Sequence, residues 1–113
     1  MTEQQLQSVM RQNIAQAAAS QSLTLQKAEQ LAELVLKRAA EMGVNAVVAV
    51  ADSGGNPVLC KRADHAFLAS WDIALGKAYT VTALKMSTAK LSVLAAPGGE
   101  LYGIQFTNGG KIV

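Results

Sequence analysis

The spacing of apolar residues in the N-terminal part of the chain predicts two amphipathic helices. Residues 4–19 place apolar side chains three or four positions apart with glutamines between them, which is typical of a helix with one face in water. Thr24 can cap a second helix, whose apolar face runs through residues 28–42, and Gly43 suits the left-handed position that ends a helix. Leu34 and Leu36 lie off this face, so we expect another subunit to cover them.

The next segment predicts a β-hairpin. Residues 44–51 form a nearly continuous β-branched run, which indicates a strand buried on both faces of a sheet. The sequence Asp-Ser-Gly-Gly-Asn-Pro at 52–57 supplies residues that tolerate positive φ, and a second strand follows at 58–62. The two glycines do not make a phosphate-binding loop, because no helix follows them and the lysine of that motif is missing.

The C-terminal half predicts two helices and the start of a strand. Residues 70–85 and 88–94 have helical spacing. Gly76 lies inside the longer helix, where glycine costs about 1 kcal/mol relative to alanine, so we expect close approach of another backbone or of a flat ligand. Residues 101–107 have no clear pattern, and Asn-Gly-Gly at 108–110 predicts a turn into a strand that begins at Lys111. Because such a strand leaves an open sheet edge, we expect further C-terminal strands to be missing after Val113.

Composition favours one folded domain over residues 1–113. Half of the 113 residues are apolar and 16% are charged, unlike a disordered chain. A net charge of +2 and 4% aromatic residues argue against nucleic acid as a partner. The N-terminus resembles no secretory signal, and no apolar run reaches the ~18 residues of a membrane span. Cys60 alone excludes an internal disulfide, and we expect a cytoplasmic protein with no membrane partner.

The chemically distinctive side chains gather between residues 62 and 80. His65 is the single histidine, so a paired zinc site has no second imidazole. A cysteine hydrolase built on Cys60 and His65 needs a fold-back that the strand does not predict. An imidazole can instead bind haem iron, and Arg62 and Lys77 can neutralise the propionates. Further candidate ligand contacts are Asp64, Phe67, Trp71, Tyr79 and Thr80. Exposed-loop, packing and subunit-contact roles stay open for all of these residues.

Several segments match a known family in order: residues 23–28, 48–55, 62–66, 70–80, 97–99 and 101–103. The most specific is Ser-Trp-Asp-Ile-Ala-Leu-Gly-Lys-Ala-Tyr-Thr at 70–80. With these segments the chain resembles the GlcG/HbpS family, which includes the C-terminal domain of PduO-type cobalamin adenosyltransferases. It departs from the family at His65, where the usual Arg-x-Asp-Gly-Ala has glycine, and in lacking the strands and helix that normally follow Val113.

The resemblance implies an α+β fold in which helices flank an antiparallel sheet, with profilin-like layering. It also implies a homo-oligomer, a dimer or possibly a tetramer or octamer, and for some members haem at subunit contacts. We therefore expect a non-catalytic domain that binds a tetrapyrrole, haem before corrinoid, in a cleft between subunits, with His65 as the iron contact. It would be accessory to diol, glycerol or glycolate metabolism. The alternative is an assembly or partner-docking module without a ligand. Adenosyltransferase activity has no phosphate-binding motif to support it.

Overall fold

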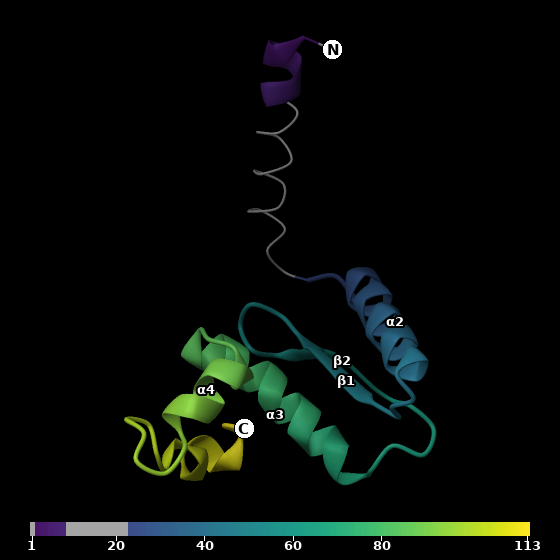
Figure 1. The fold of residues 1–113 in the computed structure, drawn as a ribbon. Coiled ribbons are helices and arrows are strands. Elements are labelled where there is room, and N and C mark those ends of the chain that lie inside the picture. Colours follow the sequence, from purple (N-terminus) through teal and green to yellow (C-terminus); the bar gives the residue numbers. More distant parts are fainter. Residues whose placement is uncertain (1, 9–22) are drawn as a thin grey trace.

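The computed structural model describes residues 2–8 and 23–113 of the chain. The elements after residue 23 are, in order, α2 (Leu25–Glu41), β1 (Val47–Ala51), β2 (Pro57–Arg62), α3 (Ala69–Leu84), α4 (Thr88–Leu94) and two short 3₁₀ helices, η1 (Ile104–Phe106) and η2 (Asn108–Gly110) (Figure 1). Of the helix predicted over residues 4–19, residues 4–8 are helical and the rest lie outside the described residues.

Helix α2 confirms the second predicted helix together with both of its end signals. The Thr24 hydroxyl accepts a hydrogen bond from the Lys27 amide at 3.2 Å, and Gly43 follows the helix with φ +72°. Ala28 and Ala32 are fully buried where α2 packs on both strands. The buried face differs from the predicted one. Leu36, which the spacing placed off the face, is half-buried one turn after Ala32, so its prediction is wrong. Other large apolar side chains of α2 are exposed, namely Leu31, Leu34, Val35 and Met42.

The predicted hairpin is confirmed, with different boundaries. Strands β1 and β2 pair antiparallel, with Val48 opposite Lys61 and Val50 opposite Leu59. β1 begins at Val47 rather than Val44, and Pro57 opens β2 instead of ending the pairing. The register shifts where Pro57 lies opposite Ala51, and a proline at the first residue of a strand costs no ladder hydrogen bond.

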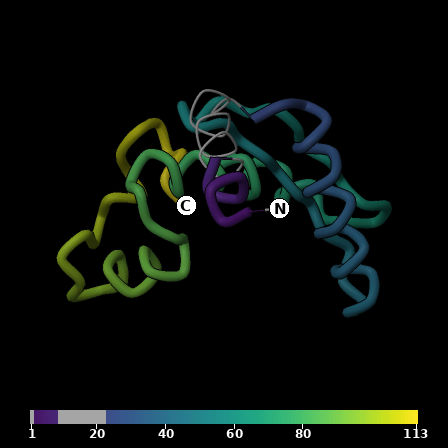
Figure 2. Tube along the Cα trace, turned by 90° about the horizontal axis from the view of Figure 1, so that it is seen from above, coloured from purple at the N-terminus to yellow at the C-terminus, as the bar shows by residue number. Residues whose placement is uncertain are grey.

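Helices α2 and α3 cover the two faces of this hairpin. Lys61 of β2 reaches Glu33 of α2 at 2.8 Å, so this residue and its pairing partner Val48 face α2. The alternate residues of β1 face α3, which contacts both strands. Seen from above, α2 lies at one end of the molecule, and α4 with the C-terminal segment lies at the other (Figure 2). The strands are half-buried rather than fully buried. The expected antiparallel sheet flanked by helices is confirmed.

The C-terminal strand predicted at Lys111 is wrong. Residues 108–110 form η2, and residues 111–113 lie against α3 without joining the sheet. The Val113 amide donates to the Thr80 hydroxyl at 3.0 Å, and a Cβ on Gly76 would lie 3.1 Å from the Lys111 carbonyl oxygen. Ile112 is buried in consequence. The expectation that Gly76 admits another backbone is therefore confirmed, and the backbone belongs to the same chain.

Candidate functional site

The turn between β2 and α3 carries most of the residues singled out in the sequence. We call Arg62, Asp64, His65, Phe67 and Trp71 the loop cluster. The Ala66 amide closes the turn on the Ala63 carbonyl at 3.1 Å, and the Arg62 guanidinium donates to the Ala66 carbonyl at 3.3 Å. Ala66 is buried beneath them, so the exposed side chains project from a fixed backbone.

His65 occupies an unusual backbone position in this turn. Its φ is +68°, which few residues other than glycine adopt, although Asn, Asp and His tolerate it better than most. Its side chain is exposed. The turn thus presents the imidazole to solvent from a conformation that suits the family's glycine equally well.

Exposed large apolar side chains follow His65 closely in the sequence. Phe67 and Leu68 are each 80% exposed, and Trp71 on the first turn of α3 is 37% exposed. Monomeric proteins seldom expose such neighbouring apolar groups unless a ligand or partner covers them. A flat apolar ligand with a metal centre and acidic groups would find an imidazole, apolar surface and a cation here.

The three remaining candidates lie farther along α3 and point in different directions. A helix turns by about 100° per residue, so Lys77, Tyr79 and Thr80 cannot all face one ligand. Lys77 lines a separate cleft next to α4. Thr80 is fully buried, and its hydroxyl is bonded to backbone groups of Gly76 and the C-terminal segment. The loop cluster thus lies on one turn and the start of α3, and Lys77, Tyr79 and Thr80 lie farther along that helix.

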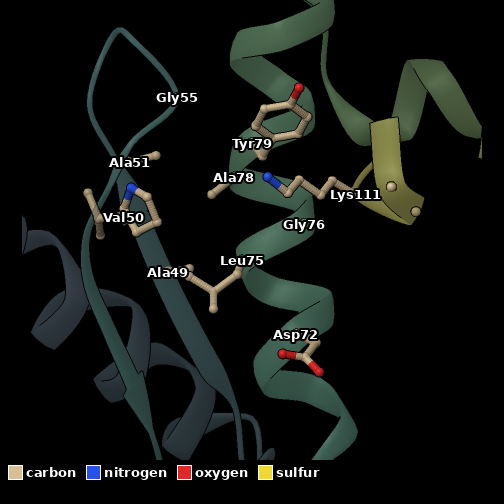
Figure 3. A pocket seen from close by; sticks show the side chains of 13 residues that line it. Ala49, Val50, Ala51, Gly55, Asp72, Leu75, Gly76, Ala78, Tyr79 and Lys111 are labelled. Atoms are coloured by element: carbon tan, nitrogen blue, oxygen red, sulfur yellow. The ribbon is translucent and has the colours of Figure 1, made fainter. Parts of the chain in front are cut away.

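Tyr79 instead lines a cavity that the sequence did not indicate. This cavity, which we call the slot, has a volume of about 480 Å³ and is lined by residues of β1, α3 and the C-terminal segment (Figure 3). Its lining residues are Ala49, Val50, Ala51, Gly55, Pro57, Asp72, Leu75, Gly76, Ala78, Tyr79, Gly109, Gly110 and Lys111.

Three side chains give the slot its polarity. Lys111 and Tyr79 lie near one end, and Asp72 lies at the other (Figure 3). The Lys111 Nζ is 5.5 Å from the centre of the Tyr79 ring, which is a cation–π distance. Sequence reasoning missed Asp72 and Lys111. The seven-residue spacing of Asp72 and Tyr79 was a readable signal, but the place of Lys111 depends on how the C-terminal segment folds back.

Two ionisable groups of the hairpin have shifted pKa values. The hydrogen bond to Glu33 raises the pKa of Lys61, and partial burial raises the pKa of the Cys60 thiol. Neither group belongs to the loop cluster or the slot. Within residues 2–8 and 23–113, no three His, Cys, Asp or Glu side chains gather as a metal site. No helix in the described parts of the chain is long and apolar enough to cross a membrane.

Comparison with known proteins gives the family. The model of the family described as "Haem degrading protein HbpS-like" matches residues 23–113. The chain belongs to the HbpS-like family. A curated relative of this HbpS-like chain is an uncharacterized 15.0 kDa protein of the dhaT–dhaS intergenic region of Citrobacter freundii, 42% identical over 92 residues. That match covers 81% of this chain and 65% of the relative, so the HbpS-like chain spans less than two thirds of the relative's length.

Two further matches tie the HbpS-like chain to PduO proteins. The corrinoid adenosyltransferase PduO of Citrobacter freundii is 35% identical over 81% of this chain, a match that covers 28% of that enzyme. A crystal structure of a PduOC:heme complex is 34% identical, with a TM-score of 0.76, and the match covers 81% of this chain and 67% of that one. The crystal structure of Klebsiella pneumoniae protein ORFY is 44% identical with the same TM-score, covering 82% and 64%. The expected resemblance is confirmed.

Proposed function

We propose that this chain is a non-catalytic, homo-oligomeric domain that binds haem at the loop cluster, against a second copy of itself. The observation that carries the proposal is the single histidine, held in an exposed turn beside two apolar side chains that are each 80% exposed. The family description and the PduOC:heme complex support haem as the ligand class.

The residues of the loop cluster fit such a ligand. His65 would bind the iron, Phe67 and Trp71 would contact the porphyrin plane, and Arg62 would neutralise a propionate. Bound haem would supply redox or gas-binding chemistry at its iron. Asp64 is exposed beside His65 and can orient the imidazole through a hydrogen bond, a role that stays a prediction. Lys77 and Tyr79 lie elsewhere and are not needed for this arrangement.

A second copy is part of the proposal because the side chains of the loop cluster are exposed in a single chain. The apolar side chains of α2 that the hairpin does not cover argue in the same direction. They also favour a second candidate function, in which the chain is an assembly or docking module without a ligand. Corrinoid binding and an accessory role in diol, glycerol or glycolate metabolism stay predictions.

Haemin titration followed by absorbance tests the proposal. The informative variant is His65→Asn, because asparagine also tolerates positive φ, so the turn is kept and only the imidazole is lost. We expect a Soret shift with the wild-type chain, its loss in His65→Asn, and partial recovery when free imidazole is added. A Soret spectrum that is the same for both chains would contradict the assignment of His65.

A matched pair of phenylalanines tests the apolar contact. Phe67 and Phe106 are 80% and 81% exposed, but only Phe67 lies in the loop cluster. We expect Phe67→Ser to weaken haemin binding about tenfold or more and Phe106→Ser to leave it unchanged. Light scattering with and without haemin then separates the two functions. An oligomer that forms without any response to haemin or to aquocobalamin would favour the assembly module. A spectrum that bleaches with reductant and oxygen would contradict a non-catalytic role.

A further inference from the structure

We propose that the slot is a second binding site, which takes a small organic carboxylate with an apolar body and a hydrogen-bond donor at its far end. The slot uses none of the loop-cluster residues. The proposal therefore stands apart from haem binding.

The slot exists because small residues face each other across it. Ala49 and Ala51 of β1 and Ala78 of α3 line the slot from its two sides, and Gly76 adds no side chain to it (Figure 3). The resulting cavity of about 480 Å³ falls within the roughly 300–1,000 Å³ of small-molecule sites. Its walls are aliphatic over most of their length, with Leu75 beside the alanines. The middle of the slot thus favours an apolar body.

One end of the slot offers two donors to an anion. The Tyr79 hydroxyl oxygen accepts a hydrogen bond from the Asn108 side-chain amide at 3.0 Å, which leaves its own proton free to donate. The Lys111 ammonium lies over the same ring. The ion pairs formed by residues 2–8 and 23–113 lie on α2 and β2, so Lys111 has no carboxylate partner among these residues. An ammonium and a phenol can both donate to the oxygens of one carboxylate.

The other end offers an acceptor. Asp72 precedes Tyr79 by seven residues, or two helical turns, which places it on the same side of α3 about 10 Å away along the axis. Asp72 forms no ion pair within the described ranges, residues 2–8 and 23–113. Its carboxylate repels a second anion and accepts a hydroxyl or ammonium proton. These ends together select a molecule about 10 Å long with a carboxylate at one end and a donor at the other.

3-(4-Hydroxyphenyl)propionate has these three features and serves as the probe. Its two matched relatives are 3-phenylpropionate, which lacks the distal donor, and 3-(4-hydroxyphenyl)propanol, which lacks the carboxylate. Calorimetric titration of the full chain should rank the hydroxy acid first. Equal affinity for the acid and the alcohol would overturn the proposal, as would the absence of binding by any of the three at millimolar concentration.

Variants locate the binding on the protein. We expect Lys111→Met to lower the affinity for the hydroxy acid at least about tenfold, the loss typical of a charge-assisted hydrogen bond. Lys90 is an exposed lysine of α4 outside the slot, and Lys90→Met should leave this affinity unchanged. Asp72→Asn should lower the affinity for the hydroxy acid more than the affinity for 3-phenylpropionate. Ala51→Leu should abolish binding by filling the slot from β1. If circular dichroism shows that this variant does not fold, Ala78→Leu fills the slot from α3 and should have the same effect. Equal losses in Lys111→Met and Lys90→Met would refute the site.

The same variants separate this proposal from haem binding. Lys111→Met should keep the wild-type response to haemin, and His65→Asn should keep the affinity for the hydroxy acid. Failure of the acid to bind leaves the haem proposal intact, and failure of haemin to bind leaves the slot intact. A haemin response that depends on Lys111 and Ala51 rather than His65 would assign the slot to haem and overturn the small carboxylate.

Discussion

Replacing Thr80 with valine tests whether one buried hydroxyl holds the C-terminal segment on α3. The Thr80 side chain is fully buried. It donates to the Gly76 carbonyl at 2.8 Å, lies 3.3 Å from the Lys111 carbonyl, and accepts from the Val113 amide at 3.0 Å. Valine keeps nearly the same shape and removes all of these hydrogen bonds, so packing changes little.

The size of the effect follows from which group loses its partner. The Gly76 carbonyl still accepts the helical hydrogen bond from the residue-80 amide, so its loss is small. The Val113 amide has no other hydrogen-bond partner among the described residues. Val113 is 40% exposed, so water can partly replace the lost partner. The net worth of an ordinary hydrogen bond, about 0.5–1.5 kcal/mol, therefore sets the expected loss for docking of the segment. At tenfold per about 1.4 kcal/mol, protection of the Val113 amide from hydrogen exchange should fall by roughly 2- to 12-fold.

Hydrogen exchange followed by NMR measures the protection of each amide separately, and urea unfolding measures the stability of the whole domain. Thr80→Ser is the matched control, because it keeps the hydroxyl and removes a methyl group. We expect Thr80→Ser to lower the free energy of unfolding while the Val113 amide keeps most of its protection relative to the helix. If Thr80→Val leaves Val113 as protected as in the wild type while overall stability falls, the hydroxyl does not hold the segment.

Three further outcomes are expected at the hairpin. Because burial raises the pKa of the Cys60 thiol, a smaller fraction of this thiol is ionised at neutral pH. Cys60 should therefore react with a disulfide reagent more slowly than glutathione does, and its reaction rate should rise when urea unfolds the chain. The raised pKa of Lys61 means that its ion pair with Glu33 stabilises the fold while Lys61 is protonated, as it is at neutral pH. The difference in Tm between wild type and Lys61→Met should therefore disappear as the pH rises through that raised pKa. Added salt should make the same difference smaller. The Asp52 carboxylate accepts three hydrogen bonds in the β1–β2 turn, so Asp52→Ala should cost about 1–2 kcal/mol in urea unfolding, and Asp52→Asn less, since the amide oxygen still accepts. Equal Tm differences at pH 7 and at strongly alkaline pH would contradict the Lys61 pairing.

Capping and turn residues in the sequence were sufficient to predict the helix starts and the hairpin. Thr24 caps α2 as predicted, and Ser87 caps α4 in the same way, since a cap needs only the amide three residues later. The hairpin also followed from its turn residues. The errors lie at the ends of β1 and β2, where pairing across the sheet decides the boundary. The sequence predicts the second strand over 58–62, but Pro57 opens it, because the first position of a strand does not require an amide proton.

The candidate site was predictable only in its contiguous part. Arg62, His65 and Phe67 lie within six residues of each other, so one turn holds them together whatever the rest of the chain does. Lys77 and Tyr79 also lie close in sequence, but two helical positions rotate the side chains by about 200°, which sends them into different cavities. Proximity in sequence is thus informative in a turn and misleading along a helix.

Gly76 shows how a correct expectation can leave its cause undetermined. A glycine inside a helix predicts that something approaches closely, and a Cβ there would lie 2.7 Å from a methyl carbon of Val113. The sequence gives no means of choosing between a ligand, a subunit and the chain itself, because residues 111–113 look like a strand when read alone. The choice is made by Thr80, one turn later on the same face, whose buried hydroxyl binds a backbone amide of that segment. Once the segment is docked, Lys111 lies over Tyr79, so the charge at the end of the slot depends on the hydrogen bonds of the Thr80 hydroxyl to that segment.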